Sequence, residues 1–132
     1  MPKSIEIMKE EIAAQAKVFD ICGPDIMKQV EEIFETTDLG KKINRIYVTG
    51  CGDSYFAGLA CRSFFVKYAK VPIQVYQALE FSRYVCPNEV DEKAVVLSIS
   101  SSGMVARTVE CALGAKQKGA LSIGVTRNSN SR

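Results

Sequence analysis

Twice in this sequence a short apolar run rich in β-branched residues ends in a loop of small residues, and a helical pattern follows at once. The runs are 43–49 and 94–99, and the loops that follow them are 50–54 and 100–103. Runs of this length and composition are typical of buried strands. Strands that alternate with helices favour a parallel sheet, because a crossover helix returns the chain to the same edge. This repeated order limits the chain to an α/β fold.

The other segments extend the alternation. Helical periodicity at 54–69 and 104–118 predicts two helices, and Gly119 is suited to the position after the second. We expect further strands at 71–76 and 121–126, a short helix or turn at 79–84, and a polar loop at 86–93. Ser54 or Asp53 is the expected N-cap of the first helix. The chain is thus predicted to form a doubly wound parallel sheet of flavodoxin-type order, 2-1-3-4, with helices on both faces.

The N-terminal third has a different pattern. Apolar residues at steps of three and four over 5–19 predict a helix, and Gly23-Pro24 is expected to end it. A second helix should begin at Pro24 and fade over 36–40. We therefore expect two N-terminal helices in a segment 1–40, followed by the sheet domain at 41–132.

Charge and hydropathy exclude several classes of partner. The 17 basic and 15 acidic residues give a net charge of +2, which gives no reason to expect nucleic acid or an anionic membrane as partner. No apolar run approaches the roughly 20 residues that span a bilayer. The N-terminus is charged throughout, so no secretory signal is expected and the predicted location is the cytoplasm.

The chain has five cysteines in no CxxC pair, and it has no histidine. A zinc site is therefore not expected, and a Ser-His or Cys-His nucleophile pair cannot be built from these residues alone. We interpret the cysteines as reduced and mostly buried.

Both small-residue loops have the properties of an anion site. Small residues let the backbone approach a ligand, and the following helix presents unpaired N–H groups and a partial positive charge. Ligands of open α/β sheets bind at the carboxyl ends of strands where the strand order reverses, and strands one and three flank that point. A plain turn after the first strand, or a solvated N-cap loop after the third, is the structural alternative.

A nucleotide site is less well supported. Gly50-x-Gly52 begins like a dinucleotide fingerprint, but Tyr55 stands at the third glycine position and Gln77 stands where an acidic residue is expected. No GxxxxGK[ST] sequence is present. We expect no cofactor.

Three stretches carry a family resemblance: IYVTGCGDSYFAGL at 46–59, QALEFSRY at 77–84 and SISSSGMVARTVE at 98–110. They resemble the SIS (sugar isomerase) domain family, and most of all the isomerase half of the glucosamine–fructose-6-phosphate aminotransferases. The resemblance covers about 43–128 and, more weakly, 7–15. It implies a doubly wound fold with a five-stranded parallel sheet, and sugar-phosphate binding.

The resemblance also implies roles for individual residues. Hydroxyl and backbone donors would hold the phosphate, from Ser54, Ser100, Ser101, Ser102 and Gly103. Residues implied to lie against the sugar are Cys51, Gly52 and Asp53. Glu80 would lie near the site or at a subunit contact, and a plain surface carboxylate is an equally open interpretation.

Three positions depart from the aminotransferase pattern. That pattern has glutamine in place of Ser101, and threonine in place of Val105 and Asp53. Valine cannot donate a hydrogen bond, and an aspartate beside a phosphate is repulsive unless it faces sugar hydroxyls. These departures point to a different sugar phosphate.

The family's proton-transfer groups, a glutamate and a histidine, lie in a second similar domain, so no catalytic residue is assigned here. We expect a domain truncated after its fourth strand, with an apolar edge that a partner or further sequence covers. Without a glutaminase domain, glutamine-dependent amination is not expected. A homo-oligomer is expected.

Three functions remain open at this stage. The chain could serve a sugar-phosphate isomerase, or a related deaminase or deglycase, whose catalytic groups come from outside it. It could instead sense a sugar phosphate without chemistry, which the missing histidine favours. The third possibility is a scaffold for interactions that uses the α/β core only for structure. Such a scaffold would have no affinity for anions.

Overall fold

The computed structural model describes residues 2–37, 43–128 and 130. The chain divides into two compact units, Met1–Gly40 and Lys41–Arg132. The sequence-predicted boundary at residues 40 and 41 and part of the predicted polar end (129 and 131–132) lie outside the described residues.

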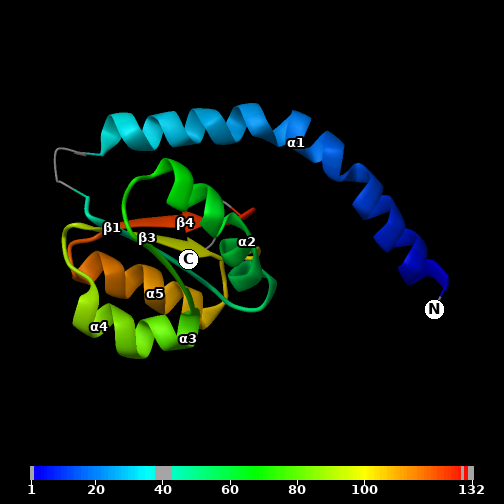
Figure 1. Ribbon diagram of the computed structural model, residues 1–132. Helices are drawn as coiled ribbons and strands as arrows, with labels where there is room; N and C mark the ends of the chain where they lie inside the picture. Colours follow the sequence, from blue (N-terminus) through cyan, green and yellow to red (C-terminus); the bar gives the residue numbers. More distant parts are fainter. Residues whose placement is uncertain (1, 38–42, 129, 131–132) are drawn as a thin grey trace. The chain divides into compact units, whose positions relative to one another are not determined.

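The first unit contains one helix, α1 (Pro2–Thr36), and not the two helices predicted from the sequence. Figure 1 draws α1 as one continuous, curved ribbon with no break at Pro24. The prediction was wrong because proline has a φ angle that already suits a helix, so Pro24 costs one backbone hydrogen bond and some crowding without forcing an end. Gly23 and Asp25 beside it are weak helix formers, but the turns beyond them contain strong ones, among them Ala16, Lys17, Met27 and Lys28.

The second unit is built on a four-stranded parallel sheet in the order β2-β1-β3-β4, as predicted from the sequence. The strands are β1 (Arg45–Gly50), β2 (Ile73–Gln77), β3 (Ala94–Ile99) and β4 (Leu121–Val125). Their bounds lie within two residues of the predicted ones, and those of β3 agree fully. This order places β1 and β3 side by side on either side of the point where the strand order reverses.

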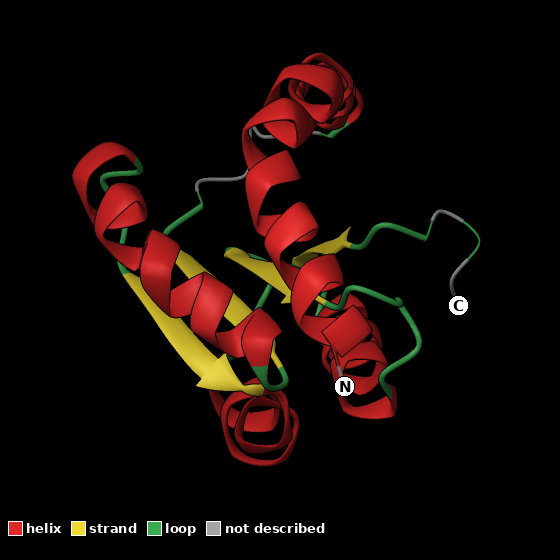
Figure 2. Ribbon diagram, turned by 90° about the vertical axis from the view of Figure 1, so that its right-hand side faces the viewer, coloured by secondary structure: helices red, strands yellow, loops and turns green. Residues whose placement is uncertain are grey.

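Helices cover both faces of the sheet, which confirms the doubly wound architecture (Figures 1 and 2). The helix α2 (Asp53–Tyr68) packs on β1 and β2 from one face. On the other face lie α3 (Ala78–Glu80), the π-helical turn η1 (Phe81–Val85), α4 (Cys86–Glu89) and α5 (Ala106–Gln117). As predicted, Gly119 follows α5 with a φ of 78°.

The predicted polar loop at 86–93 is wrong in its first half. Residues 86–89 form α4, and Cys86 is buried in the core cluster together with Val90. The local composition of this segment is polar, but the two apolar side chains pack into the core on the α5 side of the sheet. Burial of those side chains stabilises a helical turn that the local sequence does not favour.

The core on that face is aromatic at one end and small at the other. Tyr47 of β1 and Phe81 of η1 are fully buried, with ring centroids 5.5 Å apart. Val96, Cys111 and Ala115 continue the cluster beneath α5. Small side chains on α5 let this helix lie close to the sheet, which fixes the direction in which its N-terminus points.

All five cysteines are free, as expected, but only Cys86 and Cys111 are buried, so the prediction that most of them are buried was wrong. Cys22 of α1 and Cys61 of α2 are exposed. They lie on helix surfaces where other apolar side chains are exposed as well. The Cys111 Sγ donates to the Ala78 carbonyl at 3.2 Å and lies 3.6 Å from the Thr49 hydroxyl.

Burial raises the pKa of the Cys111 thiol from 9.0 to about 11. A raised pKa of an acid means that the folded state holds its proton more tightly than the unfolded state. The resulting stability is present below pH 9 and is lost as pH rises through 11. We expect the free energy of unfolding to fall by about 2 kcal/mol over this range from Cys111 alone. Urea denaturation from pH 7.5 to 11 measures it, and Cys111→Ala should show a smaller fall; equal falls in both proteins would contradict the assignment.

Candidate functional site

The site lies at the carboxyl edge of the sheet. Gly50, the last residue of β1, is in register with Ile99, the last residue of β3. The loops that leave these two residues therefore start side by side, and they line one cavity of about 280 Å³. Its lining residues are Cys51, Asp53, Ser54, Ile99, Ser100, Ser101, Ser102, Val105 and Thr108.

The first loop turns sharply into α2 at Gly52. This residue has φ 55° and ψ −126°, a backbone conformation that residues with a side chain rarely adopt. Gly52 is also the N-cap of α2, so the predicted capping by Ser54 or Asp53 was wrong. With Gly52 as the N-cap, α2 starts at Asp53. An Asp53 cap would have placed the first helical residue at position 54. Asp53 then lies in the first turn of α2, where it is exposed and lines the cavity.

The serine loop is closed by its own hydroxyl groups. The Gly103 N–H donates to the Ser100 carbonyl at 3.0 Å and to the Ser100 Oγ at 3.1 Å. The Met104 N–H donates to the Ser102 Oγ at 3.2 Å. A hydroxyl that accepts an N–H keeps its own proton, so both serines can still donate to a ligand. Ser100 is buried, whereas Ser101 and Ser102 are exposed.

The end of β4 holds this loop from behind. The Ser100 N–H donates to the Val125 carbonyl at 3.0 Å, and the Ser101 carbonyl accepts from the Arg127 N–H at 3.3 Å and the Thr126 hydroxyl at 3.4 Å. These bonds use the Ser100 N–H and the Ser101 carbonyl. Within the described residues, the N–H groups of Ser101 and Ser102 donate to no protein acceptor. The loop thus keeps donors available for a ligand.

The electrostatic character of the cavity comes from backbone and hydroxyl groups. Val105 precedes α5, and no side chain caps the N-terminus of this 12-residue helix. Lysine and arginine are missing from the described lining residues, and Asp53 is the single charged group among them. An anion here would be held by helix N–H groups and neutral hydroxyls, and not by an ion pair.

Most of the residues singled out from the sequence come together here. Ser54, Ser100, Ser101, Ser102, Cys51 and Asp53 line the cavity. Gly52 and Gly103 belong to the same two loops without lining it. Glu80 does not line it either: it is exposed at the end of α3. Its carboxylate helps to raise the pKa of Tyr76, after burial and Glu89.

Sequence reasoning missed Ile99 and Thr108 as lining residues. Thr108 is buried in the first turn of α5, and its hydroxyl lies 3.9 Å from the Cys51 Sγ across the two loops. The sequence could have predicted Thr108 as a lining residue. It stands in the first turn of the helix that follows the serine loop, and that turn lies at the ligand-binding edge of the sheet. Ile99 carried no polar signal.

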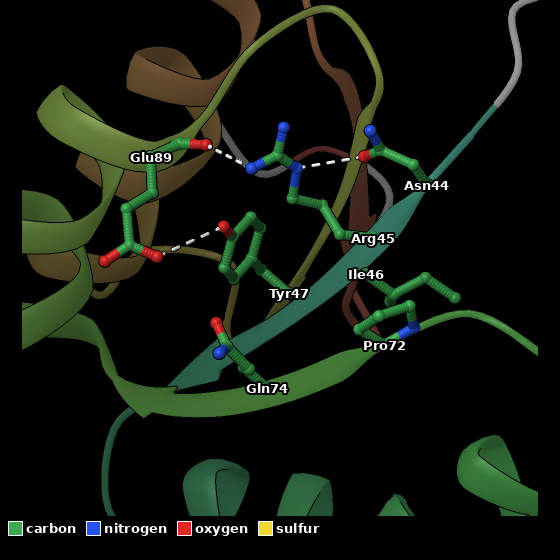
Figure 3. A pocket seen from close by; sticks show the side chains of 7 residues that line it. All are labelled: Asn44, Arg45, Ile46, Tyr47, Pro72, Gln74 and Glu89. Atoms are coloured by element: carbon green, nitrogen blue, oxygen red, sulfur yellow. Dashed lines mark hydrogen bonds between the residues drawn. The ribbon is translucent and has the colours of Figure 1, made fainter.

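A larger cavity, of about 400 Å³, lies at the opposite, amino edge of the sheet (Figure 3). Its main polar group is the Arg45 guanidinium, which already bonds the Asn44 Oδ1 at 2.9 Å, the Glu89 carbonyl at 3.2 Å and the Asp91 carboxylate at 2.6 Å. This network ties α4 and the start of β3 to β1. Because each guanidinium nitrogen already bonds a protein acceptor and ligands of such sheets bind at the carboxyl edge, we assign no binding function to it.

Within the described residues, no group of three or more His, Cys, Asp and Glu side chains is placed to hold a metal ion. Among the helices so described, none has the length and apolar character that crossing a bilayer requires.

Comparison with known proteins gives a consistent result. A family profile described as SIS domain matches residues 41–132. The glutamine–fructose-6-phosphate aminotransferase [isomerizing] of Clostridium tetani is 36% identical over 126 residues, which are 90% of this chain and 20% of that protein. The C-terminal domain of glucosamine–fructose-6-phosphate aminotransferase from Francisella tularensis superposes with a TM-score of 0.64 at 32% identity, over 79% of this chain and 27% of that one.

Glucosamine-6-phosphate deaminase of Thermotoga maritima shares the fold, with a TM-score of 0.61 at 21% identity over 80% of this chain and 33% of that one. The chain spans about a fifth of the length of the curated relatives that match it at 36% and 33% identity.

Proposed function

Because this chain belongs to the SIS domain family, we propose that it forms the phosphosugar-binding part of a sugar-phosphate isomerase. The reaction class is aldose–ketose isomerisation, or the related deamination or deglycation, of a hexose or amino-hexose phosphate. The observation that carries the proposal is that the loops after β1 and β3 line one cavity with hydroxyl and amide donors at the start of α5.

The phosphate lies in the serine loop. Ser101 and Ser102 donate from their hydroxyls and their N–H groups, and Ser54 donates from the first loop. Ser100 and Gly103 form the loop's closing hydrogen bond and keep these donors convergent. The sugar extends over Cys51, Gly52 and Asp53, and Glu80 lies at the outer margin of the sugar or at a subunit contact.

The proton-transfer groups lie outside these 132 residues. Isomerisation needs a base that takes a proton from one of the two carbons, C1 or C2, and returns it to the other. Histidine is absent from the sequence, and the cavity offers a single carboxylate, Asp53. The role of this chain is then to anchor the phosphate so that the open-chain sugar is presented to groups from elsewhere.

A non-catalytic sugar-phosphate sensor is the second candidate, and the absence of histidine favours it. The two functions differ in turnover. The test is an assay with fructose 6-phosphate and with glucosamine 6-phosphate on the protein in its natural assembly, with binding measured in parallel. The isomerase proposal expects turnover of at least one of them. Binding without any turnover would leave the sensor, and no binding would exclude both.

We further propose that residues 41–132 are the phosphosugar-binding domain and 1–40 a helical extension. A homo-oligomer in the cytoplasm is the proposed setting. The free cysteines support the reducing compartment, and the edge position of β4 supports a covering partner.

The Asp53 carboxylate should weaken binding of inorganic phosphate. A unit charge about 6 Å from another in water contributes about 0.7 kcal/mol, and a phosphate dianion doubles it. Asp53→Asn is therefore expected to tighten phosphate binding about threefold to tenfold at low salt, measured by isothermal titration. Glu92→Gln makes the same charge change at an exposed position on the opposite edge and should alter binding far less. Unchanged or weaker binding in the Asp53 variant would contradict the placement of the anion.

A further inference from the structure

A second, smaller cavity lies behind the serine loop. It has a volume of about 100 Å³ and opens between the first half of α5 and the ends of β3 and β4. Four hydroxyl-bearing residues line it: Ser98, Ser100, Thr108 and Thr126. Ser100 and Thr108 also line the main cavity, so these two side chains separate one space from the other.

Ser98 is the unusual member of this group. It lies on β3, is 4% exposed, and its Oγ is the one buried side-chain N or O atom of the described residues with no hydrogen-bond partner. A buried hydroxyl without a partner destabilises the folded state, so it normally bonds a protein group or an ordered water. The partner in this position has to come from the cavity.

The sheet leaves room for that partner at Gly124. This residue is in register with Ser98, so its missing side chain would point to the same face of the sheet. A Cβ built on Gly124 meets no atom within 4 Å. A water molecule takes up about 30 Å³ in the liquid and needs two to four polar partners. The cavity has the volume for water, and its lining includes the unpartnered Ser98 hydroxyl and three further hydroxyl-bearing residues.

We propose that this cavity holds ordered water that bonds the Ser98 hydroxyl to the back of the serine loop, which makes Ser98 a positioning residue of the phosphate site. The inference rests on the proposed function for its effect on ligand binding. Water bonded to Ser98 and Ser100 keeps the Ser100 hydroxyl in the orientation that closes the loop. The donors of Ser101 and Ser102 then stay directed at the ligand.

Three variants test the proposal. Ser98→Ala removes the hydroxyl, and Gly124→Ala adds a methyl group into open space and so displaces water without a clash. The matched control is Ser122→Ala, because Ser122 does not line the cavity and its hydroxyl already bonds the Ala112 carbonyl at 3.0 Å under the same helix. Each is measured for the urea midpoint and for the dissociation constant of fructose 6-phosphate, and a high-resolution crystal structure of the wild type shows the solvent in the cavity.

Ser98→Ala is expected to lower the urea midpoint and to raise the dissociation constant about threefold to tenfold. Gly124→Ala should raise that constant similarly while keeping or increasing stability, and Ser122→Ala should change stability alone. An equal or higher midpoint in Ser98→Ala would overturn the proposal, because it would mean that the hydroxyl has no partner. A dry cavity, or a midpoint loss without any change in affinity, would also overturn it. If the wild type binds no sugar phosphate, the proposed function fails, and the midpoint and the solvent density still decide whether water is held.

Discussion

Ser102→Ala is expected to weaken binding of a sugar phosphate by about tenfold or more. Ser102 is exposed and lines the main cavity, and its N–H, like that of Ser101, donates to no acceptor among the described residues. A hydrogen bond to a charged group contributes about 1.5–3 kcal/mol, and 1.36 kcal/mol corresponds to a factor of ten. The alanine also leaves the Met104 N–H without its present acceptor, so the loop loses part of its closure.

The measurement is isothermal titration of fructose 6-phosphate into the wild type and the variant. Ser63→Ala is the matched control, since Ser63 is exposed on α2 and does not line the cavity. It should bind as the wild type does. An unchanged dissociation constant in Ser102→Ala would remove the serine loop from the phosphate site.

Gly58→Ala is expected to destabilise the domain by about 1–3 kcal/mol. Alanine normally stabilises a helix interior relative to glycine by about 1 kcal/mol. Here the added Cβ would lie 2.9 Å from Val48 Cγ1 and 3.1 Å from Val75 Cγ1, because α2 packs closely on β1 and β2. Overpacking of the interface should therefore outweigh the gain in helix propensity.

Urea denaturation gives the free energies of unfolding for Gly58→Ala, Val48→Ala and the double variant. The free energy of unfolding that the double variant loses should be smaller than the sum of the losses in the two single variants. The reason is that the methyl group added at position 58 enters the space that the Val48 side chain leaves. A Gly58→Ala protein as stable as the wild type would show that α2 can move away from the sheet at little cost.

The strands and their order were predictable because their signals are local. The β3 strand is apolar and β-branched, and the loop 100–103 follows it without a gap. The adjacency of the two loops followed from the sheet topology, since Gly50 and Ile99 end neighbouring parallel strands. Those two facts were enough to bring Cys51, Asp53, Ser54 and the three serines to one cavity.

What the sequence did not reveal depends on contacts between distant residues. Burial of Cys86 against the core makes α4 helical, although residues 87–89 give no apolar helical pattern. The anchoring of Ser101 by Thr126 joins residues 25 positions apart, and no periodicity encodes it. At Pro24 the sequence rule was too strong, since a proline can remain inside a long helix, as it does in α1.

The most direct test of the central claim is a paired titration with fructose 6-phosphate and fructose. The two ligands differ only in the phosphate, so the ratio of their dissociation constants isolates the contribution of the serine loop and the start of α5. We expect fructose 6-phosphate to bind at least a hundredfold more tightly, from two or more charge-assisted hydrogen bonds of about 1.5–3 kcal/mol each. Equal affinity for both sugars would contradict the claim that these two strand ends form a phosphate site.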